Sequence, residues 1–67
     1  MNKALITKIL SAYMDINDGS LTIVTDDKVF NNCYVNDLDL NLVYITDKDN
    51  KTYRIEINDI IGIQFQD

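Results

Sequence analysis

The chain has 67 residues, the length of a single domain, and its 11 acidic and 6 basic residues give a net charge of -5. A chain this short buries only about 60% of its unfolded surface, so we expect oligomerisation to bury more. The six basic residues are scattered along the sequence. Because an acidic chain without a basic cluster repels phosphate backbones, sequence-independent nucleic-acid binding is disfavoured.

Cysteine and histidine usage limits the chemistry of the chain. Cys33 is the single cysteine and there is no histidine, so we expect no internal disulfide, no metal site and no cofactor. Without a histidine to activate its thiol, Cys33 is predicted to be a small buried residue. A single free cysteine is typical of a reducing interior, and no run of about 18 apolar residues is present to span a membrane. The predicted location is the cytoplasm.

The N-terminal stretch KALITKILSAYM predicts a short amphipathic helix over residues 3–14. Its apolar residues recur at helical spacing and form one stripe, which consists of Leu5, Ile6, Ile9, Leu10 and Tyr13. A first strand is the competing interpretation, because Ile, Thr and Tyr all favour strands. The turn cluster DINDGS at residues 15–20 ends the element.

Two strands joined by a tight turn are predicted next. The stretch LTIVT predicts a strand over residues 21–25, VFNNCYV predicts a second over 29–35, and DDK forms the turn between them. Asn31 and Asn32 interrupt the second strand. Because Asn accepts a positive φ better than most residues, we expect a bulge or a sharp bend there.

Three further strands are predicted over residues 40–46, 52–58 and 60–65. The first is apolar on both faces and needs cover on both sides; the faces are Leu40, Leu42 and Tyr44 on one side and Val43 and Ile45 on the other. The second alternates, with Tyr53, Ile55 and Ile57 predicted to point inward and Arg54 and Glu56 outward. The short last strand has Ile61, Ile63 and Phe65 on one face.

One helix followed by five short strands predicts a mostly β domain that spans residues 1–67. The tight turns and the bend at the asparagines favour a small, strongly bent, five-stranded barrel. We expect the barrel to be closed, because closure removes most of the exposed strand edges that such short strands would otherwise present.

Asp37 and Asp39 stand between leucines in the stretch NDLDLNLVYITD at residues 36–47. As residues i and i+2 on a strand they would share one face, about 6.6 Å apart, and pairs of carboxylates are common in catalysis. No histidine, nucleophile or glycine-rich loop accompanies them. We therefore predict solvated turn residues, no catalytic residue and no enzyme activity.

The stretch DLDLNLVYI resembles the first signature of the Sm/LSm family, which is Asp, two variable residues, an apolar residue, Asn and then an apolar strand. The residues that fit in register are Asp37, Leu40, Asn41, Leu42 and Val43. The order of elements is also similar. A short helix precedes the first hairpin, and YRIEINDIIGI stands where the second signature would lie. The short connection between the signatures is similar to that of the bacterial Hfq branch.

The resemblance implies an Sm-like barrel, with a generic SH3-like barrel as the alternative, and ring assembly through edge strands. It also implies that Asp37, Asp39 and Asn41 are the binding positions of the first signature. The signatures are degenerate, because Asn58 and Asp59 replace the Arg-Gly of the second Sm signature and the Tyr-Lys-His of Hfq is absent. Asp39 stands where a stacking or basic residue would help RNA binding, so nucleic acid is disfavoured as a partner.

Three functions are compatible with this sequence. The first is a non-enzymatic, self-associating Sm-like barrel that acts as an assembly or protein-interaction module, with itself or another protein as partner and no membrane. The second is a small acidic inhibitor of the phage type that mimics nucleic acid and binds a host nucleic-acid-binding or defence protein. The pairs Asp37/Asp39 and Asp47/Asp49, with Asp26 and Asp27, would imitate a row of phosphates, and the acidic patch candidates are Asp26, Asp27, Asp47 and Asp49. The third is an RNA- or nucleotide-binding Sm protein that uses Asn41.

Overall fold

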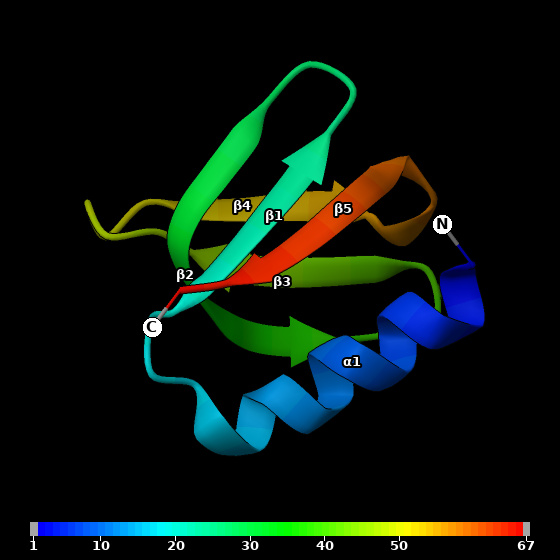
Figure 1. Cartoon of the computed structure of the whole chain (residues 1–67), viewed down its shortest axis with the longest axis horizontal. Coiled ribbons are helices and arrows are strands. Elements are labelled where there is room, and N and C mark those ends of the chain that lie inside the picture. Colours follow the sequence, from blue (N-terminus) through cyan, green and yellow to red (C-terminus); the bar gives the residue numbers. More distant parts are fainter. Residues whose placement is uncertain (1, 67) are drawn as a thin grey trace.

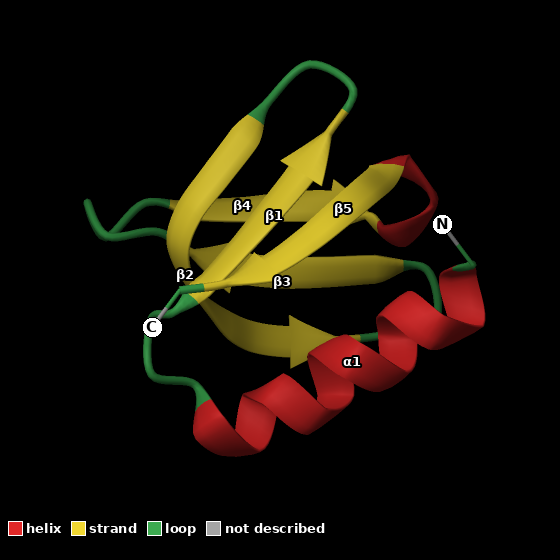
Figure 2. Ribbon diagram, viewed as in Figure 1, coloured by secondary structure: helices red, strands yellow, loops and turns green. Residues whose placement is uncertain are grey.

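A computed structural model describes residues 2–66, which form one helix followed by five strands (Figures 1 and 2). The elements are α1 (Lys3–Ile16), β1 (Leu21–Thr25), β2 (Val29–Leu38), β3 (Leu42–Thr46), β4 (Thr52–Glu56), the 3₁₀ turn η1 (Ile57–Asp59) and β5 (Ile60–Phe65). The predicted mostly β fold with an N-terminal helix is confirmed, and the competing first strand is wrong. No helix among the described residues is long and apolar enough to cross a membrane.

Asparagine side chains fix both ends of α1. At the start, Asn2 Oδ1 accepts the N–H of Ala4 at 2.8 Å. At the end, Asn17 adopts a left-handed φ of 44°, and its N–H donates to the carbonyl of Tyr13 at 2.8 Å. The Asn17 side chain also joins α1 to β2, because Oδ1 accepts the N–H of Val35 at 2.8 Å and Nδ2 donates to the Val35 carbonyl at 3.0 Å.

The five strands form one antiparallel sheet in the order β4-β3-β2-β1-β5. Residues 29–33 of β2 pair with β1, and residues 34–38 pair with β3. Between Phe30 and Cys33, just before the change of partner, β2 holds an extra residue relative to β1, and Asn32 has a φ of 55°. The bulge or bend predicted at Asn31 and Asn32 is therefore confirmed. It folds the sheet so that β1 and β5 cross in front of β3 and β4 (Figure 1).

The folded sheet keeps two edges. Among residues 2–66, β4 and β5 stand at the two ends of the hydrogen-bonded order and do not pair with each other. The expected closure is therefore incomplete. The physical reason is the connection, since η1 turns the chain directly from β4 in one layer to β5 in the other, where β5 pairs with β1.

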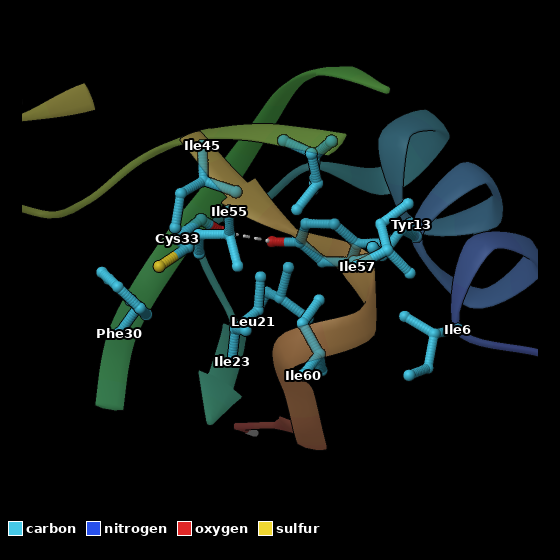
Figure 3. Packing of buried hydrophobic residues seen from close by; sticks show 13 residues of the cluster. Ile6, Tyr13, Leu21, Ile23, Phe30, Cys33, Ile45, Ile55, Ile57 and Ile60 are labelled. Atoms are coloured by element: carbon cyan, nitrogen blue, oxygen red, sulfur yellow. Dashed lines mark hydrogen bonds between the residues drawn. The ribbon is translucent and has the colours of Figure 1, made fainter. Parts of the chain in front are cut away.

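The core lies between the folded sheet and α1 (Figure 3). Each strand contributes inward side chains, and α1 contributes one stripe; the buried set is Ile6, Leu10, Tyr13, Leu21, Ile23, Phe30, Cys33, Val35, Val43, Ile45, Ile55, Ile57 and Ile60. The predicted burial of Cys33 is confirmed. The α1 stripe is narrower than predicted, because Leu5 remains about half exposed.

The turn between β2 and β3 is later in the sequence than predicted. β2 continues to Leu38, and β3 begins at Leu42 rather than residue 40. The N–H of Asp39 donates to the Leu42 carbonyl at 2.9 Å, which closes a tight turn over these residues. Leu40 stands in that turn and is exposed, so its predicted place on an apolar strand face is wrong.

The end of the chain differs from the prediction in two places. β4 ends at Glu56 rather than residue 58, and Ile57 is buried from η1 instead of from the strand. In β5, Ile60 is buried whereas Ile61 and Phe65 are about half exposed. A register shift between β1 and β5 adds Ile61 as an extra residue, and this breaks the regular alternation on which the prediction depended.

The Tyr13 hydroxyl connects the end of α1 to the turn before β1 and to β2. The ring is buried against the core, with 2% of the residue exposed, and Phe65 packs on it with ring centroids 5.6 Å apart. The hydroxyl oxygen accepts the N–H groups of Gly19 at 2.9 Å and Ser20 at 3.1 Å. It lies 3.1 Å from the Cys33 carbonyl, to which it donates (Figure 3). The hydroxyl thus accepts hydrogen bonds from two N–H groups of the turn before β1 and donates one to a carbonyl of β2.

We expect Tyr13→Phe to reduce the free energy of unfolding by about 2 kcal/mol, because it removes the hydroxyl that binds the Gly19 N–H and the buried Cys33 carbonyl. The measurement is urea unfolding followed by far-UV circular dichroism. Tyr34→Phe is the matched control, because the Tyr34 side chain is 41% exposed and makes no hydrogen bond to residues 2–66. Equal urea midpoints for the two variants would contradict this role of the Tyr13 hydroxyl.

Candidate functional site

The two carboxylates of the predicted signature accept hydrogen bonds from backbone N–H groups close to them in the sequence. Asp37, near the end of β2, accepts the N–H of Leu38 on Oδ1 at 2.8 Å. Asp39 Oδ1 accepts the N–H groups of Asn41 at 2.9 Å and Leu42 at 3.0 Å. Asp39 follows the end of β2, so the two carboxylates do not share a strand face as expected. Asp39 acts as a turn residue, as predicted, because it satisfies backbone groups of the turn after β2. Asp37 lies within β2 opposite Tyr44 of β3, so its predicted place in a turn is wrong.

Asn41 joins this turn to two distant segments. Its Oδ1 accepts a hydrogen bond from Lys3 Nζ at the start of α1, and its carbonyl accepts the N–H of Ile57 at 2.9 Å. The turn therefore lies beside η1, where Asn58 and Asp59 are exposed. The role of Lys3 could not be predicted from the sequence, because no local pattern relates it to Asn41, which is 38 positions away. The chain's own lysine thus occupies the Asn41 amide oxygen.

The acidic patch candidates do not form one row. Asp26 and Asp27 stand in the turn between β1 and β2, whereas Asp47 and Asp49 stand in the turn between β3 and β4. These two turns extend from different sides of the molecule (Figure 1). Asp27 accepts the Thr25 hydroxyl at 3.2 Å. These four carboxylates therefore do not form a continuous row that could mimic the phosphates of a nucleic acid.

Asp47 organises the turn between β3 and β4. Its Oδ1 accepts the N–H groups of Lys51 at 3.0 Å and Asp49 at 2.9 Å, and Asn50 adopts a left-handed φ of 68°. These hydrogen bonds, that from Lys51 first, hold the pKa of the Asp47 carboxyl below its ordinary value because they favour the charged form. The carboxylate is therefore part of the turn's structure.

An acidic groove lies where the turn between β1 and β2 meets β4 and η1. It encloses about 560 Å³, and the charged side chains that line it are Asp26, Asp27, Lys28, Arg54, Glu56 and Asp59. Lys28 Nζ lies 5.4 Å from the ring centroid of Phe30 and 5.0 Å from that of Tyr53. The groove therefore presents four carboxylates, with one of its two cations held over aromatic rings.

The groove as a whole could not be predicted from the sequence. Asp26 and Asp27 were acidic candidates, and Arg54 and Glu56 were predicted to point outward from their strand. The structure places the side chains of Arg54 and Glu56 at the surface. The alternation in β4 was the available signal. It did not indicate that this strand faces the first hairpin, because that contact depends on how the sheet folds.

The described residues contain no group of three or more His, Cys, Asp or Glu side chains that could hold a metal ion. Burial, and to a smaller extent the negative charge of Asp47, raises the pKa of the Cys33 thiol to about 11. Because the thiolate is the reactive form, a protonated Cys33 at neutral pH is a poor nucleophile.

The β5 edge is the most unusual surface of the molecule. β5 has the sequence IIGIQF, without a charged residue or a proline. Ile61 and Phe65 are each 54% exposed, and Ile63 is half-buried. Sheet edges ordinarily carry charged side chains, prolines or covering loops that prevent pairing with other chains. The other edge, β4, carries exposed Thr52, Arg54 and Glu56.

Comparison of the chain with family models, with curated proteins and with solved structures finds no significant match. The surfaces from which a function can be inferred are therefore those of this chain itself: the uncharged β5 edge, the acidic groove and the exposed side of α1.

We expect part of the acid destabilisation of this protein to come from Asp47. Because the folded-state pKa is lowered, the carboxylate stabilises the fold above the unfolded pKa of about 3.9, and this contribution is lost as the pH falls through the folded pKa. Asp47→Asn keeps an acceptor oxygen but cannot titrate. Its urea midpoint should decline less between neutral pH and acid than that of the wild type.

The control for this measurement is Asp26→Asn. Asp26 accepts no hydrogen bond from residues 2–66 and is exposed in its turn. Its removal should leave the pH dependence of the wild type unchanged. Parallel pH profiles for Asp47→Asn and the wild type would refute the contribution of Asp47.

Proposed function

We propose that this protein is a non-enzymatic, self-associating interaction module of the Sm-like barrel type, in which the β5 edge of one copy pairs with the β4 edge of the next. The observation that carries the proposal is the uncharged β5 edge. A six-residue strand with unpaired backbone groups and two half-exposed apolar side chains is a template for strand addition.

The two edges match in length. β4 has five residues and β5 has six, and each uses one side for its neighbour in the sheet, β3 and β1 respectively. Their outer sides are free for pairing with another chain. Each pairing leaves one β4 edge and one β5 edge unused at its ends, so repetition builds a ring or an open chain of copies.

Three features support an Sm-like arrangement in particular. The helix precedes the sheet, the strand order is β4-β3-β2-β1-β5, and the turn with Asp39 and Asn41 lies beside η1. The resemblance in DLDLNLVYI thus belongs to a turn that contacts the segment carrying Asn58 and Asp59. Self-association also supplies the burial that a chain of this size lacks on its own.

We expect the wild type to have a mass above that of a monomer at micromolar concentration, and Ile61→Lys to be a monomer. The lysine places a charge on the edge strand, as natural edges do to prevent pairing. The measurement is size-exclusion chromatography with multi-angle light scattering, and far-UV circular dichroism verifies the fold of each variant.

Val29→Lys is the matched control for the edge variant. Val29 is 54% exposed, as Ile61 is, but it lies at the start of β2, opposite Val24 of β1, and belongs to neither the β4 edge nor the β5 edge. It should keep the wild-type mass. A monomeric wild type, or the same loss of mass in both variants, would rule out edge pairing.

The acidic groove favours a second candidate function, the binding of a basic protein partner. Four carboxylates line it against two cations. In this function Glu56→Gln with Asp59→Asn should weaken binding of an Arg/Lys-rich probe peptide at low salt, whereas Asp49→Asn, outside the groove, should not. The difference should vanish near 1 M salt, where the Debye length is about 3 Å. Fluorescence titration measures it, and salt-independent binding would count against this candidate.

A further inference from the structure

The side of α1 next to its buried stripe is apolar and uncovered. Residues Leu5, Ile9, Ala12 and Ile16 follow one another at intervals of four, three and four. Side chains at these intervals form one continuous row on a helix. Leu5 is 51% exposed, Ile16 is 65% exposed, Ala12 is exposed and Ile9 is half-buried. We call this row the α1 outer stripe.

The charges beside the α1 outer stripe are arranged for a second copy of the same helix. Lys8 and Asp15 are both exposed, seven residues apart, and each immediately precedes a residue of the stripe. They therefore stand on the same flank, two turns apart. When two copies of a helix pack antiparallel about a two-fold axis, each flank meets the same flank of the partner. Lys8 then faces Asp15 of the other copy, and Asp15 faces its Lys8.

The apolar contacts agree with the same register. Antiparallel packing about a point between residues 10 and 11 places Leu5 against Ile16 of the partner and Ile9 against Ala12. A large side chain thus meets a small one in the middle of the contact, which lets the two helices approach closely. In a parallel pair each flank would instead meet the opposite flank of the partner, so Lys8 and Asp15 would not face each other and these ion pairs would not form.

We propose that α1 forms an antiparallel two-fold contact with α1 of a second copy of this chain, through the α1 outer stripe and two Lys8–Asp15 ion pairs. The stripe shares no residue with β4 or β5, so the contact is separate from the edge pairing and does not depend on it. It adds a two-fold contact to any assembly that the edges form, and it joins two such assemblies face to face.

The contact is weak for isolated chains. From Leu5 to Ile16 the stripe is about 17 Å long, so a pair of stripes falls among the small, transient interfaces rather than those of stable dimers. When several copies are already joined through their edges, several stripes engage together and the contact becomes tighter by multivalency. The sensitive test is therefore one of orientation and charge.

Charge exchange tests the proposal, and Ile61→Lys is included throughout to remove edge pairing. Lys8→Asp and Asp15→Lys should each weaken self-association about tenfold, since each converts two attractive pairs into two repulsive ones. An equimolar mixture of the two should regain the lost affinity, because only mixed pairs place opposite charges together. Sedimentation velocity over a concentration series measures this. A mixture no tighter than either variant alone overturns the proposal.

Cysteine cross-linking tests the orientation separately. A mixture of Ile9→Cys and Ala12→Cys chains should form a disulfide-linked heterodimer under mild oxidation faster than either variant forms a homodimer. Cys33 does not compete, because it is fully buried. Homodimers of Ala12→Cys that form as fast as the heterodimer, or no cross-link in any sample, overturn the antiparallel contact. Since edge pairing is judged from Ile61→Lys against Val29→Lys, either proposal can fail without the other.

Discussion

The bend of β2 at Asn32 is the constraint on which the rest of this structure depends. One strand pairs with β1 through residues 29–33 and with β3 through residues 34–38, and Asn32, in the left-handed conformation, lies just before the change of partner. The Asn32 amide fixes the bend by donating to the Gly19 carbonyl and to Gln66 Oε1, both at 3.3 Å. Without the bend, β1 and β5 could not pack over β3 and β4, and the core would have no second wall.

The helix α1 packs on one side of the folded sheet, and β4 and β5 form the two edges of the sheet. Tyr13 and Asn17 bind the end of α1 to β2 and to the turn before β1, so the helix has a fixed position on the core. A core of this size cannot cover every apolar side chain that 67 residues supply. Much of the excess lies at two places, the β5 edge and the α1 outer stripe, and the proposed contacts use these two; Val29 and Leu40 are exposed elsewhere.

Much of the fold could be predicted because periodicity reports local structure directly. The helical stripe identified α1, alternation identified the strands, and the asparagine pair indicated the bend. Features that depend on the register between strands distant in the sequence could not be predicted. The extra residue at Ile61, the exposure of Leu40 and the contact of Lys3 with Asn41 all need the folded sheet. For the same reason the acidic residues were predicted as turn residues, whereas their assembly into a groove with Arg54 and Glu56 was not.

Three asparagines, Asn17, Asn32 and Asn50, adopt the left-handed conformation that glycine usually provides. A glycine is more flexible than any other residue when the chain is unfolded, so each one adds conformational entropy that folding must overcome. By turning at asparagines, this chain obtains its helix end, its strand bend and one tight turn while its unfolded ensemble stays more restricted. A domain with so small a core is thus stabilised because its unfolded state has less conformational entropy to lose on folding.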